Sequence, residues 1–396
     1  MRLLFNFIFI LLFTVKITAQ IKKETYQFSK DIENKIDEDT LAWKYQIGAT
    51  DYSISEYYLQ ALKTWDKIGS GIKTITKQDS LYFNSFKKVD AKEYIINRSK
   101  NEKIIIINEA HHNSRHRVFT TSLLQGLYDN GYRFFGLEAL SVSDSLINKR
   151  KFPIIESGYY TKEPQMANLI QDAIKIGFKL FEYEVSDDSN GKEREIIQAK
   201  NITKLINENP NSKFLIHCGY DHVIEGTPQN KSWGKAMAGR LKEYTNLDPF
   251  TIDQVAYSEK GDIKFINPYI KIVNSDKPII MVNESGKLFN GSETNDQTDC
   301  KIIHPLTEYV NERPNWLFLN GVRKEYSIPK SKIPEYPILA LAYRKNEFEQ
   351  NGIPADLIEI FNNESKINLI LEKGTYKIII KDKNYKIINK FEIKIK

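Results

Sequence analysis

Five of the six histidines in this chain fall in two short clusters. The clusters are His111, His112 and His116, and then His217 and His222. An apolar run typical of a buried β-strand precedes each cluster, at 104–107 and at 214–216. Imidazole can bind a metal ion or act as a general base near neutral pH. Because α/β proteins commonly build active sites at the carboxyl ends of strands, the clusters predict a functional site there.

Within the first cluster, His111 and Glu109 are expected in the loop that follows the strand. If a helix begins near His112, then His112 and His116 lie four residues apart on one helical face. His111 is the main functional candidate, and His112 and His116 are expected to support it.

Glu138 ends a second apolar run, at 134–137, and is the carboxylate candidate. A buried carboxylate needs a cation, a metal ion or a proton as its partner. Burial is expected to raise the pKa of Glu138 and suit it to acid–base chemistry. Its strand is expected to lie next to the strand before His111. The alternative is a structural salt bridge or a helix cap.

In the second cluster, Gly219 follows the strand and is expected to allow a tight turn that brings His222 back over the sheet edge. His222 is therefore a functional candidate and His217 a supporting residue. Arg194 and Glu195 open a predicted helix near Glu184, Asp187 and Asp188. This pair is expected to supply an anion clamp or a substrate contact, the alternative being a solvated helix start.

Several motifs that define common enzyme classes are missing from the sequence. It contains no His-Glu-x-x-His, no Gly-x-Ser-x-Gly, no dinucleotide glycine fingerprint and no Cys-x-x-Cys. A classical zinc protease, a serine hydrolase and an NAD enzyme are therefore disfavoured.

The pattern of the whole chain predicts four segments. Residues 1–20 resemble a signal peptide, 21–95 are helical, 96–330 form an α/β catalytic domain, and 331–396 form a β-rich extension. In the first segment, Arg2 precedes an apolar run at 3–15 that is too short to span a membrane comfortably. The protein is therefore expected to be secreted or periplasmic, without stable membrane insertion after signal removal.

The alternation of strands and helices predicts the fold class: an α/β fold with a mixed, largely parallel sheet flanked by helices. Strands are expected at 103–108, 132–138, 178–183, 212–217 and 250–257, with helices at 193–208 and 232–245. In the helical N-terminal region, 42–49 and 53–67 are expected to form a hairpin that turns at 50–52. The extension is expected to be an antiparallel meander of 367–372, 376–381 and 385–396.

Charge and cysteine content narrow the function classes further. The net charge of +6 is small beside 57 basic and 51 acidic residues, so no nucleic-acid partner is expected. The two cysteines, Cys218 and Cys300, either pair in an oxidising compartment or leave Cys218 as an unpaired, buried thiol.

At its clusters the chain resembles the erythromycin esterase/ChaN-like superfamily, which also includes the TraB and Tiki proteins. The carrying segments are Glu109-Ala110-His111, Leu137-Glu138-Ala139, Gly219-Tyr220-Asp221-His222 and Arg194-Glu195 leading into Gln198-Ala199-Lys200-Asn201. They cover about 100–260 of the chain. Asn108 stands where a glycine usually opens the first motif, and Gln198 stands where methionine is common. The resemblance implies the fold and the position of the site more firmly than the reaction.

These observations predict a hydrolase of an ester- or amide-type small-molecule or peptide substrate. His111 is expected to act as general base on water and Glu138 to orient or share the proton. His222 and Arg194 are expected to stabilise developing negative charge. In a metal-dependent variant, His111, His222 and a carboxylate (Glu138 or Glu109) bind a divalent ion. The alternatives are a haem- or other ligand-binding protein with histidine as axial ligand, and a scaffold without activity.

Overall fold

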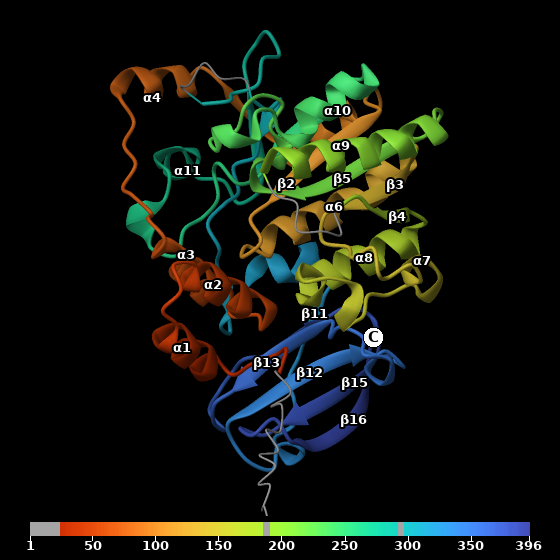
Figure 1. Ribbon diagram of the computed structural model, residues 1–396. Coiled ribbons are helices and arrows are strands. Elements are labelled where there is room, and N and C mark those ends of the chain that lie inside the picture. The colour runs from red at the N-terminus through yellow and green to blue at the C-terminus, as the bar shows by residue number, and fades with distance from the viewer. Residues whose placement is uncertain (1–23, 185–190, 292–296) are drawn as a thin grey trace, which may run out of the picture.

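The computed structural model describes residues 24–184, 191–291 and 297–396 (Figure 1). The predicted signal peptide, and with it Arg2, lies outside the described residues, as do Asp187 and Asp188.

A six-stranded parallel sheet forms the centre of the α/β body. Its strands are β2 (Ile104–Glu109), β3 (Tyr132–Leu137), β4 (Lys179–Glu182), β5 (Lys213–Gly219), β6 (Phe250–Asp253) and β8 (Cys300–Lys301). They lie in the order β4-β3-β5-β2-β6-β8, and every neighbouring pair is parallel. Each predicted strand of this region exists within a few residues of its expected limits, so the predicted α/β fold class is confirmed.

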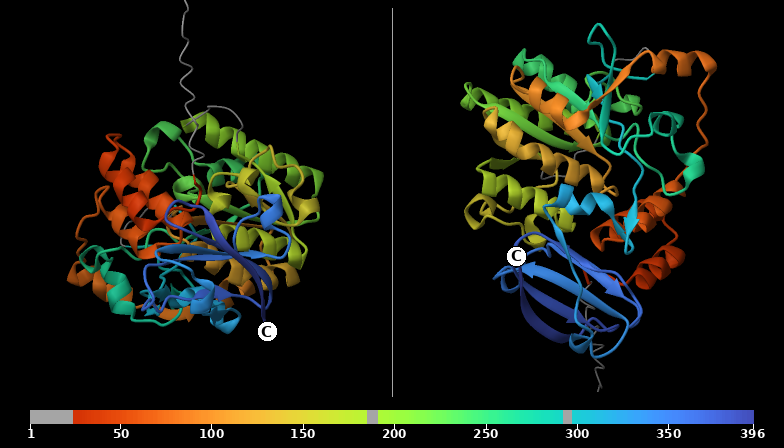
Figure 2. Two further views of the ribbon diagram at one scale, coloured as in Figure 1. Left: turned by 90° about the horizontal axis from the view of Figure 1, so that it is seen from below. Right: turned by 180° about the vertical axis from the view of Figure 1, so that it is seen from behind.

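Helices cover both faces of this sheet, which explains why β2 is apolar on both sides. Ile105 and Ile107 pack toward α5 (Ala91–Arg98), α6 (Arg115–Asp129) and α8 (Pro164–Ile176). Ile104 and Ile106 pack toward α9 (Gly191–Glu208) and α10 (Met237–Thr245) on the opposite face. Figures 1 and 2 show the helices on both faces of the sheet. Each fully buried isoleucine contributes about 2 kcal/mol of burial free energy.

The N-terminal region differs from the predicted helical hairpin. Its helices are α1 (Ser29–Glu38), α2 (Lys44–Ile54), α3 (Tyr58–Asp66) and α4 (Lys77–Asn84). The predicted turn at 50–52 lies inside α2, because buried Asp51 pairs there with Lys35 of α1. The chain turns instead at 55–57, where Glu56 has a φ of +61°. The region is also not entirely helical, since β1 (Lys87–Asp90) pairs antiparallel with β7 (Ile279–Val282).

A second sheet closes the C-terminal part of the chain, below the α/β body in Figure 1. It contains β12 (Ile338–Arg344), β13 (Asp356–Ile360), β15 (Gly374–Lys381) and β16 (Ile387–Ile395), in the antiparallel order β13-β12-β15-β16. The predicted three-stranded meander is therefore only partly correct. Its first strand, β14 (Leu369–Leu371), pairs instead with β11 (Lys324–Tyr326).

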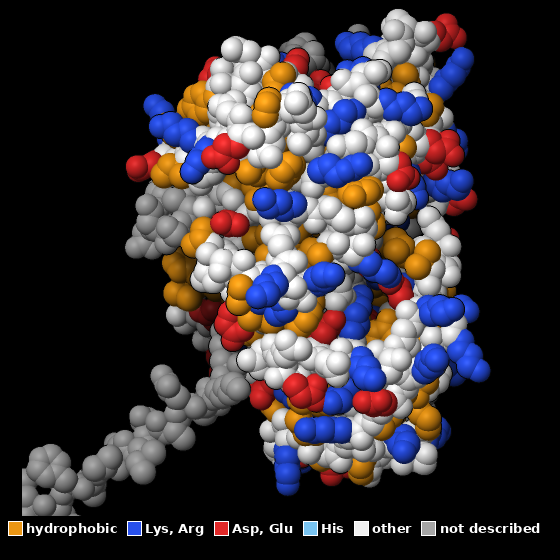
Figure 3. Space-filling view, turned by 90° about the vertical axis from the view of Figure 1, so that its right-hand side faces the viewer, with side chains coloured by type: hydrophobic (Ala, Val, Ile, Leu, Met, Phe, Trp, Pro, Cys, Tyr) orange, Lys and Arg blue, Asp and Glu red, His pale blue; other side chains and the backbone are white. Residues whose placement is uncertain are grey.

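Short elements connect these parts. They are α7 (Ile147–Arg150), α11 (Pro268–Val273), β9 (Tyr309–Val310) and β10 (Arg313–Pro314). Within the described ranges, no helix has the length and apolar character needed to cross a membrane. Lysines and arginines on the face in Figure 3 are interspersed with acidic and uncharged side chains rather than gathered in one basic patch.

The two cysteines do not form the disulfide that was one of the two expectations. Cys218 in β5 and Cys300 in β8 are buried free thiols. Because β2 and β6 lie between β5 and β8 in the sheet, the two thiols are held apart.

Candidate functional site

Three strand ends meet at the carboxyl edge of the parallel sheet and bring the predicted residues together. The strand before His111 and the strand before Glu138 are not neighbours, contrary to expectation, because β5 lies between β2 and β3. In the register, Glu109 pairs with Gly219 and Leu137 pairs with His217. The carboxyl end of β5 therefore lies between the two candidate carboxylates.

A buried ionic group, the Glu109 cluster, lies on the α6/α8 side of these strand ends. It consists of Glu109, Arg117, Glu163 and His217. Arg117 is fully buried and donates to both carboxylate oxygens of Glu109, each at 2.6 Å, and to Glu163 at 2.8 Å. Burial opposes ionisation of Glu109, but the Arg117 charge and hydrogen bonds outweigh it and hold the pKa of Glu109 well below its ordinary value. Glu109 therefore carries a permanent negative charge.

His111 lies above Glu109 at the tip of the sheet. All six histidines lie in the described part of the chain, and His111 is the one that is not buried. Its Nδ1 is 2.9 Å from Oε1 of ionised Glu109, so Nδ1 carries a proton, and in the neutral ring Nε2 then holds the lone pair. The ring stacks on Tyr160 with centroids 3.8 Å apart and meets the edge of Tyr220 at 5.0 Å. No described residue forms a hydrogen bond with Nε2.

Gly219 is required by close approach rather than by its own backbone conformation. Its φ is −89°, and the left-handed residue of the turn is Tyr220, with a φ of +40°. The expected tight turn therefore exists, but the next residue makes it. A Cβ on Gly219 would lie 2.5 Å from Nε2 of His111 and 3.4 Å from Oε2 of Glu138. His111 and Glu138 thus lie over the same backbone position.

A second ionic group, the Glu138 cluster, lies on the α9/α10 side. It consists of Glu138, Glu184, Arg194, Glu195 and His222. Glu138 accepts from the Gly219 backbone N–H at 2.6 Å and from Nη2 of Arg194 at 2.8 Å. Its pKa is lowered to about 2, because His222, His111, Arg194 and the Gly219 N–H together outweigh the burial that opposes ionisation. The expected increase in the pKa of Glu138 is therefore wrong.

Arg194 links the carboxylates of this cluster. Its Nε lies 3.0 and 3.1 Å from the two carboxylate oxygens of Glu184, and its Nη1 lies 3.2 Å from Nε2 of His222. About a quarter of its side chain is exposed, at 28%. The alternative of a solvated helix start does not describe Arg194, since its guanidinium is fixed by three side chains.

His222 is held between Glu195 and Arg194. Its Nδ1 is 2.8 Å and 3.0 Å from the two oxygens of Glu195, while its ring stacks on Trp233 with centroids 5.1 Å apart. Because a guanidinium only donates, the contact with Arg194 requires an unprotonated Nε2. Burial favours the neutral ring, but Glu138 and Glu195 outweigh it and raise the pKa of His222. Protonation of His222 therefore requires Nε2 to leave Arg194, and Glu138 lies 3.8 Å away as the alternative partner.

The remaining histidines of the clusters are structural. His112 lies before α6, so it does not share a helical face with His116 as predicted; it stacks on Trp65 at 4.0 Å. His116 accepts from the Ala110 N–H at 3.0 Å. Burial lowers the pKa of His116 to about 3 and that of His217 to about 4, so both are neutral at pH 7.

A pocket of about 350 Å³ opens onto the Glu138 cluster. The charged residues of its lining are Glu138, Glu184 and Arg194, and Tyr159 and Tyr160 also line it. Tyr160 also covers the ring of His111. A small substrate in this pocket would therefore contact both the cluster and the residue that covers His111.

Sequence reasoning missed three residues of the site: Arg117, Glu163 and Tyr160. Arg117 lies seven residues before buried Leu124 on α6, so helical periodicity placed it on the buried face and could have identified it. Glu163 caps α8 by accepting from the Met166 N–H at 2.7 Å. Tyr160 lies in a short 3-10 turn, Tyr160–Lys162, and no sequence pattern marks it.

Asn108, where the resemblance leads one to expect glycine, has a structural role. Its Nδ2 donates to the Tyr220 carbonyl and to Asp253, each at 2.9 Å, and its Oδ1 accepts from the Gln254 N–H at 2.7 Å. These bonds join the ends of β2 and β6 to the turn that carries His222.

The metal reading of His111, Glu138 and His222 does not fit this arrangement. The Arg194 guanidinium lies against both Glu138 and His222, where a divalent ion would need to be. In the described ranges, no group of three or more His, Cys, Asp or Glu side chains is placed to hold a metal ion. Haem ligation by histidine stays a prediction, to be tested by the Soret band on haem titration; both ring nitrogens of His222 are already engaged.

No family model matches the sequence, and no curated protein matches it. Among solved structures, the chain is similar to the type III effector HopBA1, with a TM-score of 0.36 and 9% identity over 54% of this chain and 93% of that chain. It is also similar to RRSP, a MARTX toxin effector domain from Vibrio vulnificus CMCP6, with a TM-score of 0.32 and 14% identity over 60% of this chain and 48% of that chain.

Proposed function

We propose that the protein is a hydrolase of small ester- or amide-type substrates in which His111 activates water. The observation that carries the proposal is the state of His111. Its Nδ1 is hydrogen-bonded to an ionised, buried carboxylate, which leaves the lone pair of the neutral ring on Nε2, and it is the histidine that is not buried. A carboxylate that orients an imidazole and stabilises its protonated form is the arrangement that general-base catalysis requires.

In this reaction Nε2 of His111 removes a proton from water as the water oxygen attacks the substrate carbonyl carbon. Glu109 stabilises the imidazolium that forms, and Arg117 keeps Glu109 ionised and in position. The imidazolium then returns the proton to the leaving oxygen or nitrogen as its bond to carbon breaks, which yields an acid and an alcohol or amine. The enzyme forms no covalent intermediate in this scheme.

The Glu138 cluster would act on the other side of the reacting carbonyl. Arg194 lines the pocket, so it can stabilise negative charge on the carbonyl oxygen. His222 lies behind Arg194, with its Nε2 3.2 Å from the guanidinium, and would help to position it. With a pKa of about 2, Glu138 is too weak a base to take the proton of water at pH 7. In the proposal Glu138 therefore orients Arg194 and His222 and does not share the proton.

The direct test measures hydrolysis of p-nitrophenyl acetate, p-nitrophenyl butyrate and a matched panel of small amides by the full chain. His111→Ala is expected to lower kcat by about 100-fold or more, as loss of a general base does. Glu138→Gln should also lower activity, through loss of the Arg194 contact. Glu193→Gln is the matched control, because Glu193 is exposed on the same helix as Arg194. Full activity in both site variants, or no hydrolysis by the wild-type chain, would overturn the proposal.

We further propose membership of the erythromycin esterase/ChaN-like superfamily and export of the protein. The segments that carry the resemblance supply the residues that meet at the strand ends, namely Glu109, His111, Glu138, Arg194 and His222, and this supports the first proposal. Export is tested by the mass of the protein after expression in a bacterium with a secretion pathway. Removal of about 20 residues from the N-terminus is expected for a signal peptide.

A further inference from the structure

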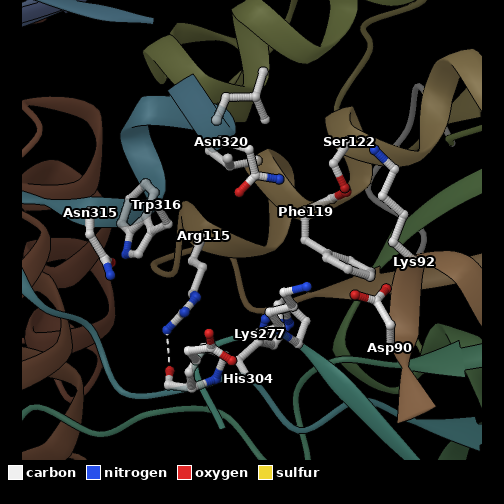
Figure 4. A pocket seen from close by; sticks show the side chains of 15 residues that line it. Asp90, Lys92, Arg115, Phe119, Ser122, Lys277, His304, Asn315, Trp316 and Asn320 are labelled. Atoms are coloured by element: carbon white, nitrogen blue, oxygen red, sulfur yellow. Dashed lines mark hydrogen bonds between the residues drawn. The ribbon is translucent and has the colours of Figure 1, made fainter. Parts of the chain in front are cut away.

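A second pocket, of about 350 Å³, lies along the first turns of α6 (Figure 4). Its walls come from α5, α6, the segment around Lys277, and the turn Asn315–Gly321. This volume is typical of sites for small ligands. The candidate hydrolase site does not use any residue of this pocket.

Arg115 supplies the pocket with a buried cation whose neutralisation is incomplete. It is 6% exposed, and its Nη1 donates to the Pro305 carbonyl and lies 3.4 Å from Glu259 and 3.5 Å from Thr307. Within the described residues, its Nε and Nη2 donate to no protein acceptor. Burial lowers its pKa to about 10, which Glu259 only partly opposes. A guanidinium with a free pair of donors favours a carboxylate, which it can bind with two parallel hydrogen bonds.

His304, beside Arg115, supplies a hydrogen-bond acceptor without a partner. Its Nε2 is 3.1 Å from Oε1 of Gln254, whose Nε2 donates to the Asn108 carbonyl. Nε2 of His304 is therefore the protonated nitrogen, and Nδ1 carries the lone pair. Nδ1 is buried and forms no hydrogen bond in the described part of the chain. A ligand that donates an O–H or N–H to this nitrogen would remove the cost of an unsatisfied buried acceptor.

The rest of the lining sets the size and the charge of the ligand. Phe119, Trp316 and Leu319 form an apolar wall, and Figure 4 shows Trp316 and Phe119 on either side of Arg115. The charged residues of the lining are Lys92, Arg115 and Lys277 against Asp90 and Asp276, so their sum is +1. This balance suits a monoanion with an apolar body.

We propose that this pocket binds a small hydroxycarboxylate with an apolar body, with the carboxylate on Arg115 and the hydroxyl on Nδ1 of His304. Mandelate is the probe, since its hydroxyl lies next to its carboxylate and its phenyl ring fits the apolar wall. Mandelamide lacks the charge, and phenylacetate lacks the hydroxyl.

The test is isothermal titration of the full-length wild-type chain with these three compounds. Mandelate is expected to bind saturably at one site. Mandelamide should bind more than about tenfold more weakly, because it loses the charge-assisted pair. Phenylacetate should bind about threefold to tenfold more weakly, because it leaves Nδ1 of His304 unpaired. Equal binding of mandelate and mandelamide, or no saturable binding of mandelate, would refute the proposal.

Variants locate the binding to this pocket. Ser122→Trp fills the pocket from a half-buried position on α6 without changing Arg115, and it should abolish mandelate binding. Arg115→Lys keeps the charge but removes the two-pronged donor, and it should weaken binding about tenfold. Lys175→Ala, an exposed lysine on α8, is the matched control and should bind as wild type. The His111→Ala variant is expected to bind mandelate as wild type does. Loss of mandelate binding in His111→Ala, or mandelate binding by folded Ser122→Trp, would place the ligand outside this pocket and reject the proposal.

Discussion

Glu138 is a buried carboxylate that the surrounding charges keep ionised. Its pKa lies at about 2 instead of 4.5, a difference that corresponds to about 3 kcal/mol of folding free energy. Because the pKa is lowered in the folded state, this stabilisation is fully present above pH 4.5 and is lost as the pH falls toward 2. At the residue scale, the electrostatics of the site are therefore an acid-sensitive part of stability.

The prediction that follows concerns Glu138→Gln. The difference in unfolding free energy between wild type and this variant should shrink by about 2 kcal/mol between pH 6 and pH 3, as wild-type Glu138 takes up its proton. Urea unfolding at several pH values measures it. The exposed control Glu193→Gln should show a difference close to zero at every pH. A Glu138→Gln difference that does not vary with pH would contradict the low pKa.

Asn108 gives a second prediction at this scale. Asn108→Ala removes three buried hydrogen bonds and leaves the Gln254 backbone N–H without its acceptor. A loss of about 2–4 kcal/mol is expected from urea unfolding at pH 7. Asn108→Gly, which restores the residue that the resemblance leads one to expect, should lose at least as much. Asn101→Ala, at an exposed asparagine, is the control; a loss as small as the control's would mean that Asn108 is not structural.

At the scale of elements, the carboxyl end of β5 determines where His111 can lie. His111 is fixed by Glu109 on one side and by Tyr160 across its ring, so it cannot retreat from a side chain at position 219. Gly219→Ala should therefore displace the imidazole. Activity is expected to fall about 10-fold to 100-fold, with a loss of stability of no more than about 2 kcal/mol.

A glycine elsewhere provides the control for this prediction. A Cβ added to Gly71 would meet no heavy atom within 4 Å, and Gly71 has no left-handed φ, so Gly71→Ala should leave both activity and stability unchanged. Kinetics on an ester substrate and thermal unfolding, measured on both variants, separate loss of position from loss of fold. Wild-type activity in Gly219→Ala would show that activity does not depend on the present position of the His111 imidazole.

The sequence predicts the central strands β2 and β5 well because each contains an uninterrupted apolar run, which burial on both faces requires. It also places His111, Glu138 and His222 at strand ends, where parallel strands converge. Strand order could not be predicted, since the insertion of β5 between β2 and β3 depends on long-range packing. The predicted direction of the Glu138 pKa shift was wrong for the same reason, because Arg194 contacts Glu138 from 56 residues further along the chain.

Local signals also failed where a distant partner decides the structure. Asp51 suggests a turn on its own, but its pairing with Lys35 keeps it inside α2. The segment 367–372 was expected to be a meander strand, yet β14 within it pairs with β11, which lies more than forty residues earlier in the chain. In both cases the deciding contact lies outside the window that a sequence pattern covers.

At the scale of the whole molecule, the N-terminal and C-terminal parts share a core. Tyr26, Phe28 and Ile54 pack against Leu339 and Leu341 of the C-terminal sheet. Figure 2 shows the N-terminal helices beside that sheet and the α/β body. The extension is therefore packed against the start of the described chain rather than appended to it, and the two parts are expected to unfold together.

A buried ionic group connects these parts and provides the last prediction. Arg313 is 2% exposed and lies 3.0 Å from Glu56 of the N-terminal region, and it also pairs with Asp356 of β13. Arg313→Met leaves two buried carboxylates without their cation, which should cost about 3–5 kcal/mol. Because burial raises the pKa of Asp356, the loss of unfolding free energy should be smaller at pH 5 than at pH 8. At pH 8 the unfolded chain ionises Asp356 freely, whereas in the folded variant either form of the buried group is costly.

Urea unfolding followed by tryptophan fluorescence and by far-ultraviolet circular dichroism should give one coincident transition in both proteins. Lys330→Met, at an exposed position, should match wild type. Two separate transitions in the wild-type chain, or a loss below about 1 kcal/mol in Arg313→Met, would show that the group does not join the parts into one unit.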